Sequence, residues 1–176
     1  GTQFVDIDGD TDLDLITVFG PVLADEDSEV NNSPYAQPDM LMLNDEGTFV
    51  DISEETGYND TGKGRSLAVG DLDRDGRPDL VSAGRVFMRA FLTRGGCDGG
   101  ITLLLDDGAK NRSGIGARVE AVIDGEPQTR WLLPSTSFGS SAPELHIGTG
   151  TADTAHITVY WTDGDVTEVG IVDAGT

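Results

Sequence analysis

The sequence of 176 residues is poor in cysteine, in basic residues and in long apolar runs. With Cys97 as the single cysteine, no disulfide can form within the chain, so stability must come from packing or from bound metal. Its 11 basic residues stand against 32 acidic ones, and the net charge of −21 excludes a basic surface for nucleic acid or anionic lipid. No apolar stretch approaches the ~20 residues that span a bilayer, so we expect no membrane insertion.

Residues typical of catalysis are also scarce. The only histidines, His146 and His156, lie in apolar, strand-like segments that indicate core or edge positions. Cys97 has no histidine partner nearby in sequence, so we expect a buried small residue, with pairing between chains or a free thiol as alternatives. Carboxylates are so abundant that pairs of them are weak evidence for acid-base chemistry. We therefore expect that the chain is not an enzyme.

Two acidic loops of the same design stand out instead. Residues 6–14 read DIDGDTDLD and residues 71–79 read DLDRDGRPD. Each places Asp at positions 1, 3, 5 and 9, and such a density of like charge is hard to fold without a cation. Ca²⁺ takes about 6–8 oxygen ligands, which these loops can supply. The candidate metal ligands are Asp6, Asp8, Asp10, Asp14, Asp71, Asp73, Asp75 and Asp79, with Asp12 and Arg77 offering carbonyl groups at position 7.

The loops do not have the pattern of an EF-hand. That loop needs a bidentate Glu at position 12 and a helix on either side, whereas position 12 here is Thr17 or Ser82. The segments after the loops are rich in branched and aromatic residues and predict strands. We therefore expect strand-loop-strand calcium turns that bind about two Ca²⁺ ions in total. An acidic surface turn without metal is the alternative.

The remaining pattern predicts an all-β chain in two domains. Short strand signals alternate with turns in the first half, at the even spacing of propeller blades or a sandwich. The glycine-rich segment 94–100 predicts a boundary, with domains at 1–95 and 96–176. A capped helical turn is expected at 53–56 and a surface insertion at 25–38. Strands are expected at 3–5, 13–19, 40–44, 48–52, 66–70, 80–83, 86–93, 101–105, 117–123, 128–133, 144–147, 156–161 and 166–172.

Four further residues and two turns attract specific expectations. Asp124-Gly125 and Asp163-Gly164 predict hairpin turns in the second half, which indicates a small antiparallel β-sandwich. In so acidic a chain, we expect Arg112 and Arg118 to clamp carboxylates or carbonyls where the two halves meet. Trp131 and Trp161 are expected to be core or interface anchors.

The motifs resemble two known families. The segments FVDIDGD (4–10), VGDLDRDG (69–76) and MLNDEGTFVDI (42–52) are similar to FG-GAP (VCBS) repeats, found in integrin alpha propellers and in many secreted bacterial proteins. The segments NRSGIGARV (111–119), LHIGTG (145–150) and VYWTDG (159–164) resemble the ASPIC/UnbV domain of cartilage acidic proteins and their bacterial relatives. Thr162 departs from the Pro usual in that family, and residues 135–141 match it only loosely.

The resemblance implies partial β-propeller blades of the FG-GAP type, followed by an ASPIC/UnbV-like β-sandwich. It implies an extracellular, secreted or cell-surface module in which calcium rigidifies the blade loops. Propellers close with about 4–8 blades, so two blades imply either a piece of a larger propeller or completion by copies of the same chain, even as a fibre. The start at Gly1, directly against a strand, indicates a processed or partial polypeptide.

The expected partners are therefore copies of the chain, or another extracellular protein or glycan, as in an adhesive or surface protein. The rival interpretation is a carbohydrate-active hydrolase or accessory domain with an acidic cleft.

Overall fold

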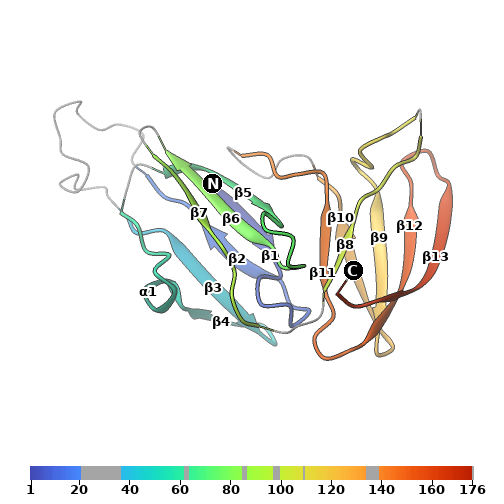
Figure 1. Cartoon of the computed structure of the whole chain (residues 1–176), viewed down its shortest axis with the longest axis horizontal. Helices are drawn as coiled ribbons and strands as arrows, with labels where there is room; N and C mark the ends of the chain where they lie inside the picture. Colours follow the sequence, from blue (N-terminus) through green and yellow to red (C-terminus); the bar gives the residue numbers. More distant parts are fainter. Residues whose placement is uncertain are drawn as a thin grey trace.

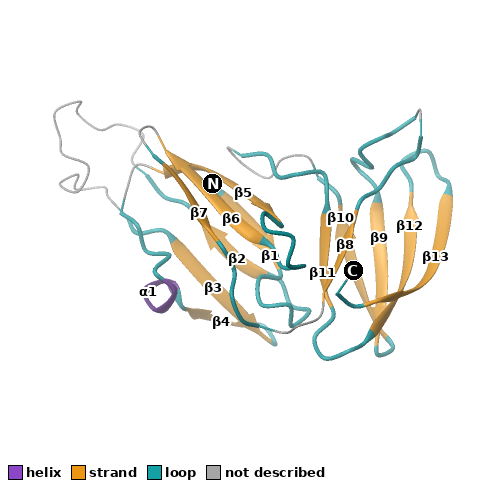
Figure 2. Cartoon of the chain, viewed as in Figure 1, coloured by secondary structure: helices purple, strands orange, loops and turns teal. Residues whose placement is uncertain are grey.

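The computed structural model describes residues 1–20, 37–61, 64–84, 87–96, 100–108, 110–133 and 139–175. In these residues the regular secondary structure is almost entirely antiparallel strand, which confirms the all-β prediction (Figures 1 and 2). The predicted helical turn is present as α1 (Ser53–Thr56), but the expected side-chain cap is wrong, because Ile52 occupies the N-cap position and the Ser53 hydroxyl bonds to Asp51 and Leu41 instead. No helix in the described ranges is long or apolar enough to cross a membrane. Cys97 and most of the expected insertion at 25–38 lie outside the described residues.

The first acidic loop joins two neighbouring strands of a four-stranded sheet. Val5 pairs with Asp14 across this hairpin, so the loop leaves and re-enters the sheet at the same level and its carboxylates are gathered at one point. The sheet has the order β1-β2-β3-β4, with strands β1 (Thr2–Val5), β2 (Asp14–Thr17), β3 (Met40–Asp45) and β4 (Thr48–Asp51).

The second acidic loop repeats this arrangement in a three-stranded sheet of order β5-β6-β7. Here Gly70 pairs with Asp79, the counterpart of the Val5 and Asp14 pair. In the first sheet β4 covers the outer edge of β3, whereas none of the described strands pairs with the outer edge of β7. The strands are β5 (Gly64–Gly70), β6 (Asp79–Gly84) and β7 (Met88–Phe91).

The two sheets share one apolar core, as expected of adjacent blades. Ile16 and Leu41 from the first sheet pack in the same cluster as Leu67 and Leu80 from the second. Tyr58, which follows α1, is 2% exposed and meets Phe91 edge-to-face at 4.9 Å between ring centroids. The alternation of buried and exposed residues is weak on β4 and β7, the outermost strands, because little covers them.

The second half is a small sandwich, as predicted. One layer has the order β10-β9-β12-β13 and the other pairs β11 with β8. Every second residue of β9 and β12 is buried, so that Val119 and Ile157 pack against Ile101 and Ile147 of the facing layer. The strands are β8 (Gly100–Leu103), β9 (Arg118–Ile123), β10 (Glu126–Trp131), β11 (Leu145–Gly148), β12 (Thr154–Tyr160) and β13 (Val166–Asp173).

The predicted hairpin turn between β9 and β10 has the chemistry that the sequence indicates. Asp124 and Gly125 have φ angles of 51° and 88°, the left-handed pair that a two-residue turn matched to strand twist requires. His146 and His156 lie on β11 and β12, as expected of histidines in strands.

Two expectations about anchoring residues are wrong, and a third is wrong for the core alone. Trp131 is 55% exposed and anchors no core, because β10 is an edge strand and its alternate side chains face outward, but it lines a cleft shared with the first domain. Arg118 does not reach the first domain, since its guanidinium lies 3.7 Å from the Tyr160 ring centroid and pairs with Glu120 in its own sheet. Arg112 is exposed in a turn. Trp161, in contrast, packs partly against the sandwich core, as predicted.

Candidate metal centres

The first acidic loop brings three of its five aspartates together. Asp6, Asp8 and Asp14 each offer a carboxylate oxygen, and these oxygens lie within 4.8 Å of one another. Asp6 and Asp14 are buried, with 1% and 0% of their surface exposed, and Asp8 is half-buried. Three carboxylates with loop carbonyls nearby form a donor set that suits a hard divalent cation such as Ca²⁺.

Backbone amides hold the two buried carboxylates of this loop. Asp14 accepts hydrogen bonds at Oδ2 from Ile7 N (2.7 Å) and at Oδ1 from Asn44 N (2.9 Å). Asp6 accepts one at Oδ2 from Thr11 N (3.0 Å), but its buried Oδ1 has no hydrogen-bond partner within the described part of the chain. A buried polar atom without a partner is costly, and a bound cation would satisfy it.

The electrostatics of the first loop oppose full ionisation when metal is absent. Burial, with the neighbouring Asp10 charge, raises the pKa of Asp6 to about 7. Burial likewise raises the pKa of Asp14 to about 6, although two amide hydrogen bonds act in the opposite direction. These carboxylates therefore lack a sufficient positive partner in the protein itself, and the residues present fit a bound cation.

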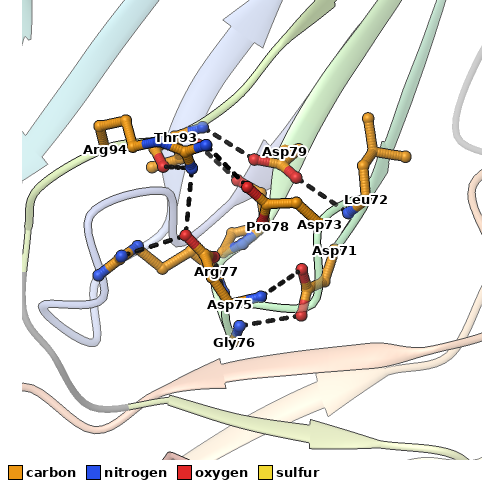
Figure 3. A network of polar contacts seen from close by, with 10 residues as sticks. All are labelled: Asp71, Leu72, Asp73, Asp75, Gly76, Arg77, Pro78, Asp79, Thr93 and Arg94. Carbon is orange, nitrogen blue, oxygen red and sulfur yellow. Dashed lines mark hydrogen bonds and ion pairs between the residues drawn. The ribbon is translucent and has the colours of Figure 1, made fainter.

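The second loop gathers the corresponding three residues. Asp71, Asp73 and Asp79 offer oxygens that again lie within 4.8 Å of one another. Asp79 is buried and accepts from Leu72 N (2.9 Å) and Thr93 N (2.8 Å), the same double clamp that holds Asp14 (Figure 3).

Asp71, Asp73 and Asp75 of this loop bond to backbone amides or to arginine side chains. Asp71 accepts from the amides of Asp75 and Gly76 at 3.1 and 2.9 Å. Asp73, the exposed member of the triad, pairs instead with a guanidinium, because Arg94 Nη2 lies 2.7 Å from its Oδ2. The Asp75 carboxylate pairs with Arg77 and Arg94.

The remaining sequence-predicted ligands of the first loop lie outside the triad. The Asp10 carboxylate accepts from Asp12 N at 2.8 Å, which holds the turn. The Asp12 carboxylate accepts from Glu46 N at 3.0 Å and ties the loop to the β3–β4 hairpin. Positions 1, 3 and 9 of each loop thus converge, whereas the side chains at positions 5 and 7 make other contacts.

The sequence does not predict the residues that clamp the closing aspartates, Asp14 and Asp79. Asn44 lies 30 residues after Asp14, and Thr93 lies 14 residues after Asp79. Because these separations differ, no repeated spacing marks the two residues as equivalent. Their amides occupy the same place in the two sheets only after the strands have paired.

The second domain docks directly on both acidic loops. Arg130 Nη2 donates to Thr11 O at 2.9 Å, and Gly150 N donates to Gly9 O at 2.8 Å. A side chain at Gly148 would place its Cβ 2.1 Å from Asp6 Oδ2, so only glycine allows this close approach.

At the second loop, Glu144 Oε1 accepts from Asp71 N at 2.9 Å. The short sheet formed by β8 and β11 faces the loops in Figure 1. The interface between the domains therefore includes both candidate metal centres, together with hydrogen bonds of Ser141 to Gln3 and to Val69 N on the blade strands.

Arg130 fills the role that the sequence indicated for Arg112 and Arg118. It projects from β10 toward the first loop, where its charge lowers the pKa of Asp6 against the larger effect of burial. Burial in turn lowers the pKa of Arg130. In the sequence, Arg130 is distinguished only as an arginine on a predicted strand of a very acidic chain. The sequence does not reveal which edge of the sandwich faces the blades.

A cleft of about 520 Å³ lies beside this interface, between β1, β10 and the segment before β11. Its walls include the exposed rings of Phe4 and Trp131, and its polar lining includes Arg130, Glu144 and His146. Burial lowers the pKa of His146 to about 4, so this side chain is neutral at pH 7.

Comparison with known families agrees with the arrangement of the two domains. Residues 6–82 match the family described as FG-GAP-like repeat, and residues 107–176 match the family described as ASPIC and UnbV. No curated protein sequence matches the chain. FG-GAP repeats form blades of β-propellers and are typical of extracellular or surface proteins.

We expect Arg130→Ala to weaken the docking of the second domain, because it removes a charge-assisted hydrogen bond to Thr11 O and a positive charge near Asp6. The free energy of unfolding should fall by about 1.5–3 kcal/mol, measured in urea. Arg112→Ala is the matched control and should change it by less than about 0.5 kcal/mol. Equal effects of the two substitutions would contradict the role given to Arg130.

The raised pKa values of Asp6 and Asp14 predict how the metal-free protein responds to pH. Because the folded state binds these protons more tightly than the unfolded state, the stability that these two groups contribute is complete below about pH 4 and is lost as pH rises from there to about 7. Each group contributes a slope of up to about 1.4 kcal/mol per pH unit within its window. Thermal melts in chelator from pH 4.5 to 8 measure this, and Asp6→Asn should flatten the slope.

Proposed function

Because the chain consists of an FG-GAP-like repeat followed by an ASPIC/UnbV domain, we propose that it is a calcium-binding interaction module of a secreted or cell-surface protein. In this function Ca²⁺ rigidifies the blade loops, and the rigid loops support the second domain. Asp6 carries the proposal. It is 1% exposed, its Oδ1 has no hydrogen-bond partner in the described residues, and it lies beside two other carboxylates.

The bound ion would supply positive charge where the chain has gathered negative charge. In the first loop the ligands would be Asp6, Asp8 and Asp14, and in the second the equivalent Asp71, Asp73 and Asp79. Backbone amides of the chain hold the closing aspartates, Asp14 and Asp79, in place without a bound ion. Pre-arranged ligands reduce the ordering cost of binding.

We propose a binding rather than a catalytic role for the module. The cleft between the domains contains carboxylates and exposed rings, as a carbohydrate-active site would. Each of its acids has another role, however: Asp6 and Asp71 belong to the candidate metal centres, and Glu144 accepts from the Asp71 amide. Two facing carboxylates free for acid-base chemistry would be needed to favour the hydrolase alternative.

We expect calorimetry to find about two Ca²⁺ sites in the chain and a melting temperature that falls in chelator. Asp8→Ala and Asp73→Ala should each remove one site, because each deletes one member of a triad. The exposed Asp173, which lies on β13 and belongs to neither triad, is the control position, and Asp173→Ala should leave both sites intact. Two sites surviving in both triad variants would refute the ligand assignment.

The partners that we propose are further copies of this chain, with another extracellular protein or glycan as the alternative. The support is the outer edge of β7, which lacks the fourth strand that β4 provides in the first blade, among the residues that the structure describes. Met88 on this strand is 77% exposed. Unpaired strand edges of this kind accept added strands.

Sizing of the purified chain in Ca²⁺ should show assemblies larger than a monomer, and electron microscopy should show whether they form rings or fibres. The amide of Ala90 faces away from β6, because Gly84 N donates to Phe87 O and the hydrogen-bonded pairs alternate along the two strands. Ala90→Pro would therefore remove a backbone donor from the outer edge of β7, and it should reduce assembly if that edge is used. A proline at Arg112, in an exposed turn, serves as the control. A monomer at all concentrations would rule out self-assembly and leave an external partner.

A further inference from the structure

The two acidic loops have the same backbone clamps but opposite charge at one matched position. Asn44 N and Thr93 N donate to the closing aspartates of the first and second loop at 2.9 and 2.8 Å. The residue that follows each clamp is therefore equivalent in the two blades. It is Asp45 at the first loop and Arg94 at the second.

Arg94 is placed over the carboxylates of the second loop (Figure 3). Its Nη2 lies 2.7 Å from Asp73 Oδ2 and its Nη1 lies 3.2 Å from Asp75 Oδ2. Asp73 is also one of the three residues whose oxygens converge within 4.8 Å. The Arg94 guanidinium thus already provides positive charge to Asp73, a carboxylate that a metal ion would need as a ligand.

Asp45 has the opposite charge at the first loop. It is exposed and follows Asn44, whose amide clamps Asp14. The guanidinium at this loop, Arg130, donates to Thr11 O and not to a carboxylate of the triad, and the buried Asp6 Oδ1 has no partner in the described ranges. The first triad therefore has no counterpart of the Arg94–Asp73 ion pair among the described residues, and it depends on an added cation more strongly than the second.

We propose that Arg94 is a built-in counter-ion that competes with Ca²⁺ for Asp73, so that the second loop binds Ca²⁺ more weakly than the first. This inference rests on the proposed function, because it concerns the affinity of those same loops. Binding at the second loop requires the Arg94 side chain to release Asp73 or to tolerate the ion beside it. Either way, the positive charge of Arg94 lowers the affinity.

The position of Arg94 also connects the second loop to the linker between the domains. Two residues later, the backbone of Gly96 packs against the first loop, since a Cβ there would lie 2.4 Å from Asp8 O. The start of the linker is thus held by the second loop at Arg94 and by the first at Gly96. Release of Arg94 by Ca²⁺ would free one of these two attachments.

The test is a calorimetric Ca²⁺ titration of the full chain and of Arg94→Gln, which keeps a polar side chain but removes the charge. The wild type should show a tighter site that is lost in Asp8→Ala and a weaker site that is lost in Asp73→Ala. Arg94→Gln should tighten the weaker site by about tenfold and leave the tighter one unchanged. Arg112→Gln, which removes the same charge from an exposed turn, should change neither affinity.

The exposed Asp45 provides the reciprocal variant. Asp45→Arg places a guanidinium at the matched position of the first loop, and it should weaken the tighter site by a similar factor. Melting temperatures give a second readout that does not depend on measured affinity. Arg94→Gln should melt lower than the wild type in chelator, where it loses a counter-ion, and at least as high as the wild type in saturating Ca²⁺.

Three outcomes would overturn the inference. If Arg94→Gln weakens the second site, Arg94 orients Asp73 for the metal instead of competing with it. If it changes neither affinity and lowers the melting temperature equally with and without Ca²⁺, the ion pair is only structural. If the wild type binds no Ca²⁺ at all, the proposed function fails, and the inference fails with it.

Discussion

The arrangement of the chain depends on a buried aspartate at the end of each acidic loop. Asp14 and Asp79 each accept hydrogen bonds from two backbone amides. One amide lies at the start of the loop and the other in a later segment of the same blade. Charge-assisted bonds of this kind are about twice as strong as neutral ones. These hydrogen bonds attach each loop to its blade without a bound ion. The short hairpin then brings the other two carboxylates of each triad close to the closing aspartate.

Most of the fold could be predicted from the sequence, because its signals are local. Short alternating segments predict the strands, and Asp124-Gly125 predicts a turn whose left-handed φ angles the structure contains. The repeated DxDxDxxxD pattern likewise predicts that each loop gathers carboxylates. The pattern does not predict which carboxylates converge. The Asp10 carboxylate accepts from an amide of its own loop and the Asp75 carboxylate pairs with Arg94, and both contacts form only when the turn has closed.

The contacts between domains could not be predicted, because they depend on which face of the sandwich meets the blades. A family motif draws attention to Arg112 and Arg118, yet one is exposed and the other stacks on Tyr160 within its own sheet. The arginine that reaches a loop is Arg130, on an edge strand without a distinctive motif. Trp131 is exposed for the same reason, since strand pairing leaves alternate side chains of β10 outside the core.

The close packing of Gly148 against Asp6 affects how force passes between the domains. The second domain contacts the first through loop backbone at Gly9, Thr11 and Asp71, and through Ser141, which bonds to Gln3 on β1 and to Val69 N on β5. Part of a pulling force between the domains would therefore pass through these turns. A turn stiffened by an ion transmits such tension with little extension, whereas a loosened turn stretches first. If the turns hold ions as proposed, the occupancy of these sites would then set the stiffness of this joint.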